Sequence, residues 1–226
     1  LATCTDGLCE LRREITEACC TPDARWPDDG SFEAPLAAPD PPSDDGWLIE
    51  GAWSVSALRS FVGESALHFG LGDGSGIAPP GEAAAGLAMS PVVRVPEDLA
   101  RWRFTLFLAT EWDAVPPDGS FDNPPGLDLL EAVVVPAGAV AVAPLVVWDS
   151  RAIAGTTRGA WQDITIDLER FAGADVRLGW RFRTGDADAN NTEGVYVDRA
   201  VVFRACPGCL DREVEGGPRC DQLGVE

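Results

Sequence analysis

The chain has 226 residues, with 17 basic and 37 acidic side chains and a formal net charge of −20. Such an acidic surface repels phosphate backbones, so nucleic acid is not an expected partner. The longest apolar stretch, residues 132–148, is interrupted by Pro136, Gly138 and Pro144. No membrane span is therefore expected, because a spanning helix needs about 20 apolar residues in succession. A chain of this length can bury one core, and we expect one main domain with short extensions.

Cysteines occur at the two ends of the chain, and none falls between Cys20 and Cys206. This distribution predicts disulfides that hold terminal extensions in an oxidising compartment. Because seven is an odd number, one thiol is free, pairs between chains or has lost its partner. Zinc binding or a redox role at Cys206 and Cys209 is an alternative, although a redox motif needs a βαβ context that the sequence does not show. The full set is Cys4, Cys9, Cys19, Cys20, Cys206, Cys209 and Cys220.

Two short extensions flank the main domain. Residues 1–30 are cysteine-rich and contain one expected helix, at 10–18, and residues 207–226 form a cysteine-containing tail. The chain begins with leucine, which suggests a processed start. Together with the cysteines, this start predicts a secreted or cell-surface protein, on the extracellular or periplasmic side of a bacterium.

Between the extensions, residues 31–206 alternate apolar and polar side chains in short runs, as strands with one wet face do. Gly- and Pro-rich loops separate the runs, without repeats or crossover helices. About ten such strands predict an all-β fold, an antiparallel two-sheet jelly-roll sandwich. The expected strand segments are 31–37, 46–56 as a pair, 65–74, 87–96, 100–113, 126–135, 140–150 and three strands within 161–206.

Several short motifs follow one another in a family-like order. They are Ser-Phe-Glu at 31–33, Ser-Ala-Leu-His-Phe-Gly at 65–70, Ile-Thr-Ile-Asp-Leu at 164–168, the segment 171–182, and 193–202. In this order the chain resembles jelly-roll modules of the MAM type. It also resembles the related modules of bacterial secreted metallopeptidases and calcium-stabilised carbohydrate-binding modules. The resemblance implies adhesion, oligomerisation or glycan binding, because such modules serve all three.

In the carbohydrate-binding relatives, a structural Ca²⁺ joins a glutamate near the first strand to an aspartate in the last. The resemblance carries these roles to Glu33 and Asp198. Two carboxylates about 5 Å apart repel by roughly 3 kcal/mol at an effective dielectric constant near 20, and a hard cation turns this repulsion into attraction. We therefore expect a structural Ca²⁺ between Glu33 and Asp198.

A second group of oxygen ligands lies in the polar turn between the last two expected strands. It consists of Asp186, Asp188, Asn190 and Glu193. The spacing lacks the turn glycine and the distant bidentate glutamate of an EF-hand loop. Either this turn binds a metal ion, or it is an ordinary solvated acidic turn.

Catalysis is not expected. The one histidine, His68, lies in an apolar run and is interpreted as a packed or edge residue, and no nucleophile, metallopeptidase or phosphate-loop motif occurs. Two carboxylate pairs, Glu111 with Asp113 and Asp128 with Glu131, could converge as they do in a glycosidase, but close pairs are common in so acidic a chain. We predict no catalytic residues.

Two of the eight tryptophans are candidate ligand contacts. Trp112 and Trp148 come at strand ends beside charged residues, where an exposed ring could stack on a sugar face; packing at the rim of the core is the alternative. Our hypothesis is a calcium-stabilised module for adhesion or for binding an extracellular glycan or protein. The alternatives are a subunit that associates with itself in a surface layer or fibre, and an accessory module of a secreted protease.

Overall fold

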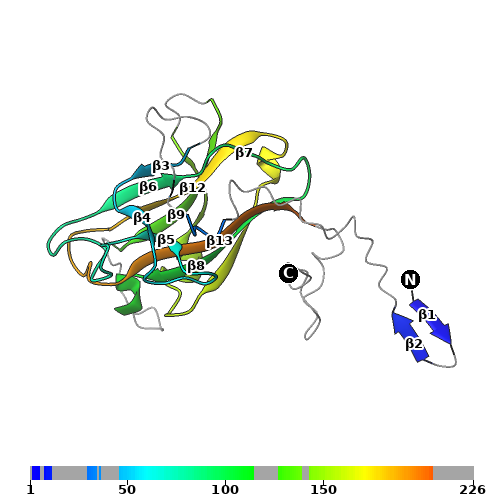
Figure 1. Cartoon of the computed structure of the whole chain (residues 1–226), viewed down its shortest axis with the longest axis horizontal. Helices are drawn as coiled ribbons and strands as arrows, with labels where there is room; N and C mark the ends of the chain where they lie inside the picture. Colours follow the sequence, from blue (N-terminus) through cyan, green and yellow to red (C-terminus); the bar gives the residue numbers. More distant parts are fainter. Residues whose placement is uncertain are drawn as a thin grey trace.

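A computed structural model describes residues 30–34, 36, 46–114, 127–138 and 143–205, together with the backbone of 2–5 and 8–11. The described chain folds as a sandwich of two antiparallel sheets, which confirms the predicted fold class (Figure 1). It contains no α-helix in these residues; three short 3-10 helices are present, η2 (Glu111–Ala114), η3 (Ser150–Ile153) and η4 (Glu169–Phe171). No helix among them has the length and apolar character to cross a membrane.

The first sheet has the strand order β10-β9-β12-β6-β3, with β7 pairing with β12 beside β6. Neighbouring strands in it are all antiparallel. Its strands are β3 (Leu48–Glu50), β6 (Ala85–Met89), β7 (Val93–Arg94), β9 (Leu129–Pro136), β10 (Leu145–Asp149) and β12 (Asp175–Arg183).

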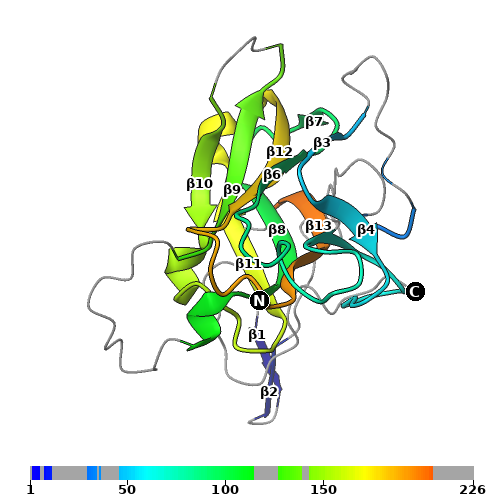
Figure 2. The same cartoon turned by 90° about the vertical axis from the view of Figure 1, so that its left-hand side faces the viewer.

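The second sheet has the order β11-β8-β13-β5-β4, again antiparallel throughout. Figure 2 shows the two sheets from the left-hand end of Figure 1. Its strands are β4 (Trp53–Ser56), β5 (Ala66–Phe69), β8 (Ala100–Ala109), β11 (Gln162–Asp167) and β13 (Gly194–Arg204). The expected pair at 46–56 is therefore split: β3 joins one sheet, and β4 crosses to the other through the turn at Gly51, where φ is +71°.

The core lies between the sheets and follows the predicted alternation. Trp102 and Phe104 of β8 face Trp180 of β12, with ring centroids 5.3 and 5.4 Å from the Trp180 ring. All three rings are fully buried, as are the other inward-facing residues of both strands. Alternate residues of a strand point to opposite faces, so the arginines of β12 project outward.

Two elements differ from the sequence-based expectation. The segment 31–37 is not a strand in its described residues, because Phe32 has a φ of +60°, which breaks an extended backbone. The regular alternation of β13 stops at a bulge after Asp198, where Arg199 has a φ of +50° and the register with β8 shifts. As a result Ala200 and Val202, rather than Val201, enter the core.

At the N-terminus, β1 (Ala2–Thr5) and β2 (Leu8–Leu11) form an antiparallel hairpin in which Cys4 lies opposite Cys9. The expected helix at 10–18 is therefore wrong at residues 10 and 11, which belong to β2, and its other residues lie outside the described chain. The side chains of all seven cysteines also lie outside the description, so the disulfides and the zinc and redox alternatives stay predictions.

Candidate binding sites

The expected Glu33 and Asp198 pair is brought to one loop, residues 60–65. Asp198, in the middle of β13, is fully buried and accepts hydrogen bonds from the backbone N–H groups of Phe61 (2.8 Å), Val62 (2.9 Å) and Arg199 (2.7 Å). Glu33 accepts bonds from the N–H groups of the same loop, those of residues 64 and 65, at 3.1 and 3.2 Å. Five N–H donors thus point at two carboxylates.

Burial raises the pKa of Asp198, the three N–H donors lower it in part, and nearby Glu33 raises it. The loop reaches the pair because Gly63 has a φ of +70° and no side chain: a Cβ there would lie 2.2 Å from Glu33 Oε1. The sequence led us to expect a Ca²⁺ that offsets the repulsion between the Glu33 and Asp198 carboxylates. In the structure, backbone N–H donors already offset much of this repulsion. A cation at Glu33 and Asp198 stays a prediction.

The acidic turn at 186–193 does not act as one ligand group. Asn190 is buried and donates from Nδ2 to the carbonyl oxygens of Glu82 (2.9 Å) and Asp186 (3.1 Å), which fixes the turn. Glu193 forms a bidentate ion pair with Arg59 at 2.8–3.0 Å. In this arrangement only Asp186 and Asp188, both exposed, keep their carboxylates toward solvent.

Neither carboxylate pair considered for a glycosidase converges. Glu111 and Asp113 lie on η2 rather than on a strand, and Asp113 turns away to accept bonds from Thr110 N–H and Thr156 Oγ1. Glu131 faces outward from β9 and pairs with Arg181 at 2.7 Å.

The structure instead joins Glu111 to Asp128, because the N–H of Asp128 donates to Glu111 Oε1 at 3.2 Å. Burial, followed by the charge of Glu111, raises the pKa of Asp128 to about 7. The pKa of Glu111 is also raised, by burial and by the charges of Asp186 and Asp188. Four carboxylates from three segments therefore interact, and one of the segments is η2, the green helical turn in Figure 1. Their sequence separation hid this arrangement, although an aspartate inside the apolar run 127–130 was a usable signal.

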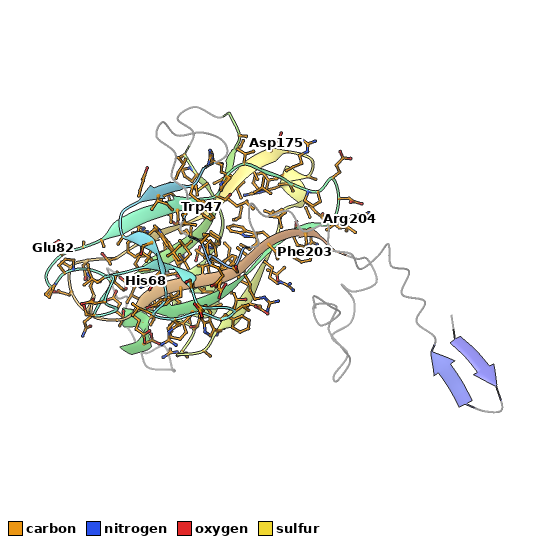
Figure 3. The ribbon with its side chains drawn as sticks, viewed as in Figure 1. Trp47, His68, Glu82, Asp175, Phe203 and Arg204 are labelled. Carbon is orange, nitrogen blue, oxygen red and sulfur yellow. The ribbon has the colours of Figure 1, made fainter. Side chains whose placement is uncertain are left out.

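His68 is a packed residue, as predicted. It is fully buried, stacks on Tyr196 with a centroid distance of 4.3 Å, and donates from Nε2 to Glu193 O at 3.1 Å. Burial lowers its pKa, and the bond to the Glu193 carbonyl opposes this effect in part. The imidazole is thus held away from solvent. Figure 3 labels His68, which belongs to β5 of the five-stranded sheet.

Both predicted ligand tryptophans are half-buried. The Trp112 ring lies against Gly155, whose φ is +74° and whose missing Cβ would sit 2.2 Å from the indole, and Nε1 donates to Asp128 O at 2.9 Å. Trp148 packs edge-on to the core ring of Phe104 at 6.1 Å. Each indole therefore has a packing role, and a ligand role for either stays a prediction.

An aromatic strip, which the sequence analysis missed, crosses the outer face of the five-stranded sheet. Its members are Phe61, Trp161, Phe107, Tyr196 and His68, and neighbouring centroids lie 4.3–6.0 Å apart. Arg59 lies over the Phe107 ring at 3.9 Å. The strip is buried at His68 but open at its other end, where Phe61 is 43% exposed and Trp161 is half-buried.

Comparisons with known proteins give the chain no family. No protein-family model and no curated protein matches it. Among solved structures, the K1 adhesin domain of Lys-gingipain from Porphyromonas gingivalis W83 is 18% identical over 77% of this chain and 95% of its own, with a TM-score of 0.45. The K3 adhesin domain is 16% identical over 80% and 99%, with a TM-score of 0.45. A third solved structure, from work on carbohydrate-binding modules of the β-sandwich superfamily, is 13% identical. The match covers 70% of this chain and 57% of that one, with a TM-score of 0.39. Likenesses this distant carry no argument about function, and the MAM-type resemblance stays a prediction.

Proposed function

We propose that the chain is a non-catalytic, secreted or cell-surface adhesion module that binds a glycan at the open end of the aromatic strip. The observation that carries this proposal is the exposed Phe61 ring, which packs against Trp161 at 5.8 Å. Binding sites combine apolar and aromatic surface with a few placed polar groups. The C–H faces of a pyranose ring fit such a surface.

Polar groups that could orient a sugar lie beside the two rings. The Arg199 guanidinium is 5.5 Å from the Phe61 centroid. Asp163, exposed on the neighbouring strand β11, accepts a 2.7 Å hydrogen bond from Thr105. Guanidinium and carboxylate groups form paired hydrogen bonds, which suit the vicinal hydroxyls of a sugar.

Leu58 and Val62, close to Phe61 in the chain, are also exposed, at 51% and 45% against 43% for Phe61. Contiguous exposed apolar groups mark interaction sites in general, so a protein ligand or a second copy of the chain is the competing occupant. The glycan is favoured because the Phe61 and Trp161 ring pair occurs together with the Arg199 guanidinium here.

The test is a glycan array followed by affinity gel electrophoresis on the polysaccharides that score. We expect Phe61→Ala to weaken retardation about five- to tenfold, as loss of one stacking contact worth roughly 1–1.5 kcal/mol implies. The matched control is Leu145→Ala, which removes similarly exposed apolar surface (46%) from β10 of the other sheet and should leave binding unchanged.

Two results would overturn the proposal. An array without hits, together with dimers that Phe61→Ala dissolves in light scattering, would assign the patch to self-association. Loss of glycan binding in Trp112→Ala and Trp148→Ala, but not in Phe61→Ala, would place the ligand at the two tryptophans predicted from the sequence.

A further inference from the structure

The acidic end cluster consists of Glu111, Asp128, Asp186 and Asp188. Glu111 lies on η2, Asp128 directly precedes β9, and the two others lie in the turn between β12 and β13. Figure 3 labels Glu82, whose carbonyl holds this turn through Asn190, at the end of the sandwich opposite Arg204. The described hydrogen bonds of these four residues do not involve Phe61 or Trp161. An inference about the cluster is therefore independent of the proposed function.

Asp128 is the centre of the cluster. Its side chain is 2% exposed. Oδ1 accepts one long hydrogen bond, 3.4 Å from Gly185 N, and Oδ2 is buried with no hydrogen-bond partner among the described residues. Buried polar groups are almost always hydrogen-bonded, and a buried carboxylate that is neither paired nor bonded is strongly unfavourable.

Cationic side chains do not offset this charge in the described part of the chain. Other acids there have arginine partners, for example Glu131 with Arg181 and Asp98 with Arg204, whereas none of the four end-cluster carboxylates forms an ion pair. Glu111 adds a second carboxylate directly beside Asp128. The cluster therefore concentrates negative charge around an oxygen atom that lacks a donor.

We propose that the acidic end cluster binds a hard divalent cation, Ca²⁺, with Asp128 Oδ2 and the Glu111 carboxylate as its inner ligands. Ca²⁺ takes 6–8 oxygen ligands in adaptable geometry. No three acidic, histidine or cysteine side chains of the described residues already converge as a metal site. Asp186 and Asp188 are exposed, and Asp186 Oδ1 accepts the N–H of Asp188 at 2.8 Å; to serve as ligands these carboxylates would have to turn toward Asp128, and water would complete the shell.

Binding of the cation would connect η2 to the turn at 185–191. These segments are more than 70 residues apart in sequence, and the described hydrogen bonds link them through Asp128, which donates its N–H to Glu111 and accepts the long bond from Gly185. The cation would therefore also fix Trp112, whose indole N–H already bonds to the Asp128 carbonyl. Its role is structural, at the end of the sandwich.

The experiment measures the thermal midpoint of EDTA-treated protein in CaCl₂, MgCl₂ and NaCl at matched ionic strength. For a ligand at 100 times its Kd, linkage predicts a rise of about 5 °C or more in a protein of this size. We expect that rise in wild type with CaCl₂, its loss in Asp128→Asn, and its retention in Asp175→Asn, a charge-matched control at an exposed position. Glu111→Gln serves as the second variant if Asp128→Asn does not fold by far-UV circular dichroism.

Two outcomes would overturn the proposal. One is an absence of any CaCl₂-specific rise in wild type. The other is a rise that Glu33→Gln abolishes and Asp128→Asn keeps, which would place the cation at the pair expected from the sequence. Glycan binding by a variant without the Ca²⁺ response would show that the two proposals stand separately.

Discussion

Asp198 and Asp128 are both buried carboxylates beside a glutamate, yet they differ in the hydrogen bonds that they accept. Asp198 accepts three short backbone hydrogen bonds, whereas Asp128 accepts one long bond and leaves Oδ2 without a donor. The loop at 60–65 can supply its N–H groups because Gly63 has a positive φ next to Glu33. A buried acidic pair therefore indicates a cation only where backbone N–H groups do not already satisfy its carboxylates.

The largest effect is expected at the satisfied site. Asp198→Ala leaves three N–H groups without their acceptor, and we predict a loss of roughly 3–5 kcal/mol in the free energy of unfolding. Urea denaturation of the metal-free protein measures this through the midpoint at unchanged slope. A loss below about 1 kcal/mol would mean that these hydrogen bonds contribute little and that the comparison fails.

At Asp128, the unsatisfied site, the carboxylate is expected to destabilise the folded protein rather than to stabilise it. The pKa of Asp128 is raised to about 7 in the folded state from an ordinary value near 3.8, so the folded protein binds the proton more tightly than the unfolded chain. This contribution is fully present below pH 4 and is lost as the pH rises through 7. We predict that stability relative to Asp128→Asn falls by about 2–4 kcal/mol over this window without calcium.

The pH series is measured by urea unfolding of both proteins in EDTA. Asp175→Asn again serves as the charge-matched control for removal of one exposed carboxylate. A wild-type curve parallel to that of Asp128→Asn between pH 4 and pH 8 would show that Asp128 is not destabilised by its surroundings.

Gly155→Ala tests whether the Trp112 contact supports the acidic end cluster. The new Cβ meets the indole at 2.2 Å on a backbone with a φ of +74°, so we predict a loss of about 1–3 kcal/mol and a shifted tryptophan emission. Gly159→Ala has a similar φ, +76°, but nothing within 4 Å of its Cβ, and it gives the backbone cost alone. Equal losses in the two variants would remove the packing argument.

The smallest effect is expected at the exposed Arg59 and Glu193 pair. Both side chains are partly solvated, at 33% and 43%, and surface ion pairs contribute less than about 1 kcal/mol. A double-mutant cycle with Arg59→Ala and Glu193→Gln measures the coupling. A coupling energy above about 2 kcal/mol would show that Glu193, one of the predicted metal ligands, is held far more strongly than its exposure indicates.

Much of the sandwich could be predicted because strands that bury one face show the alternation in local sequence. Trp102 and Trp180 face the core as expected. The left-handed residues Phe32 and Arg199 could not be predicted, since neither residue type favours a positive φ and tertiary contacts impose it. The sequence alternation also could not predict which residues of β13 face the core after Asp198, because a bulge there changes which residues face inward.

The candidate sites depended on contacts between loops, and sequence pattern does not encode these. Carboxylates two or three positions apart were paired in the sequence analysis, whereas the structure pairs Glu111 with Asp128 across 17 positions. Phe61 was missed because a single phenylalanine in a loop has no periodicity. The resemblance to calcium-stabilised modules named Glu33 and Asp198 as Ca²⁺ ligands, which stays a prediction, and it gave no information about the backbone donors of the loop at 60–65.

Terbium luminescence tests the central claim most directly, because Tb³⁺ substitutes for Ca²⁺ and emits when a nearby indole is excited. Trp112 donates to the Asp128 carbonyl at 2.9 Å, so a cation in the acidic end cluster lies beside this ring. We predict strong Tb³⁺ emission in wild type, reversed by CaCl₂, lost in Asp128→Asn and greatly reduced in Trp112→Phe. Emission that persists in both variants and disappears in Glu33→Gln would contradict the account.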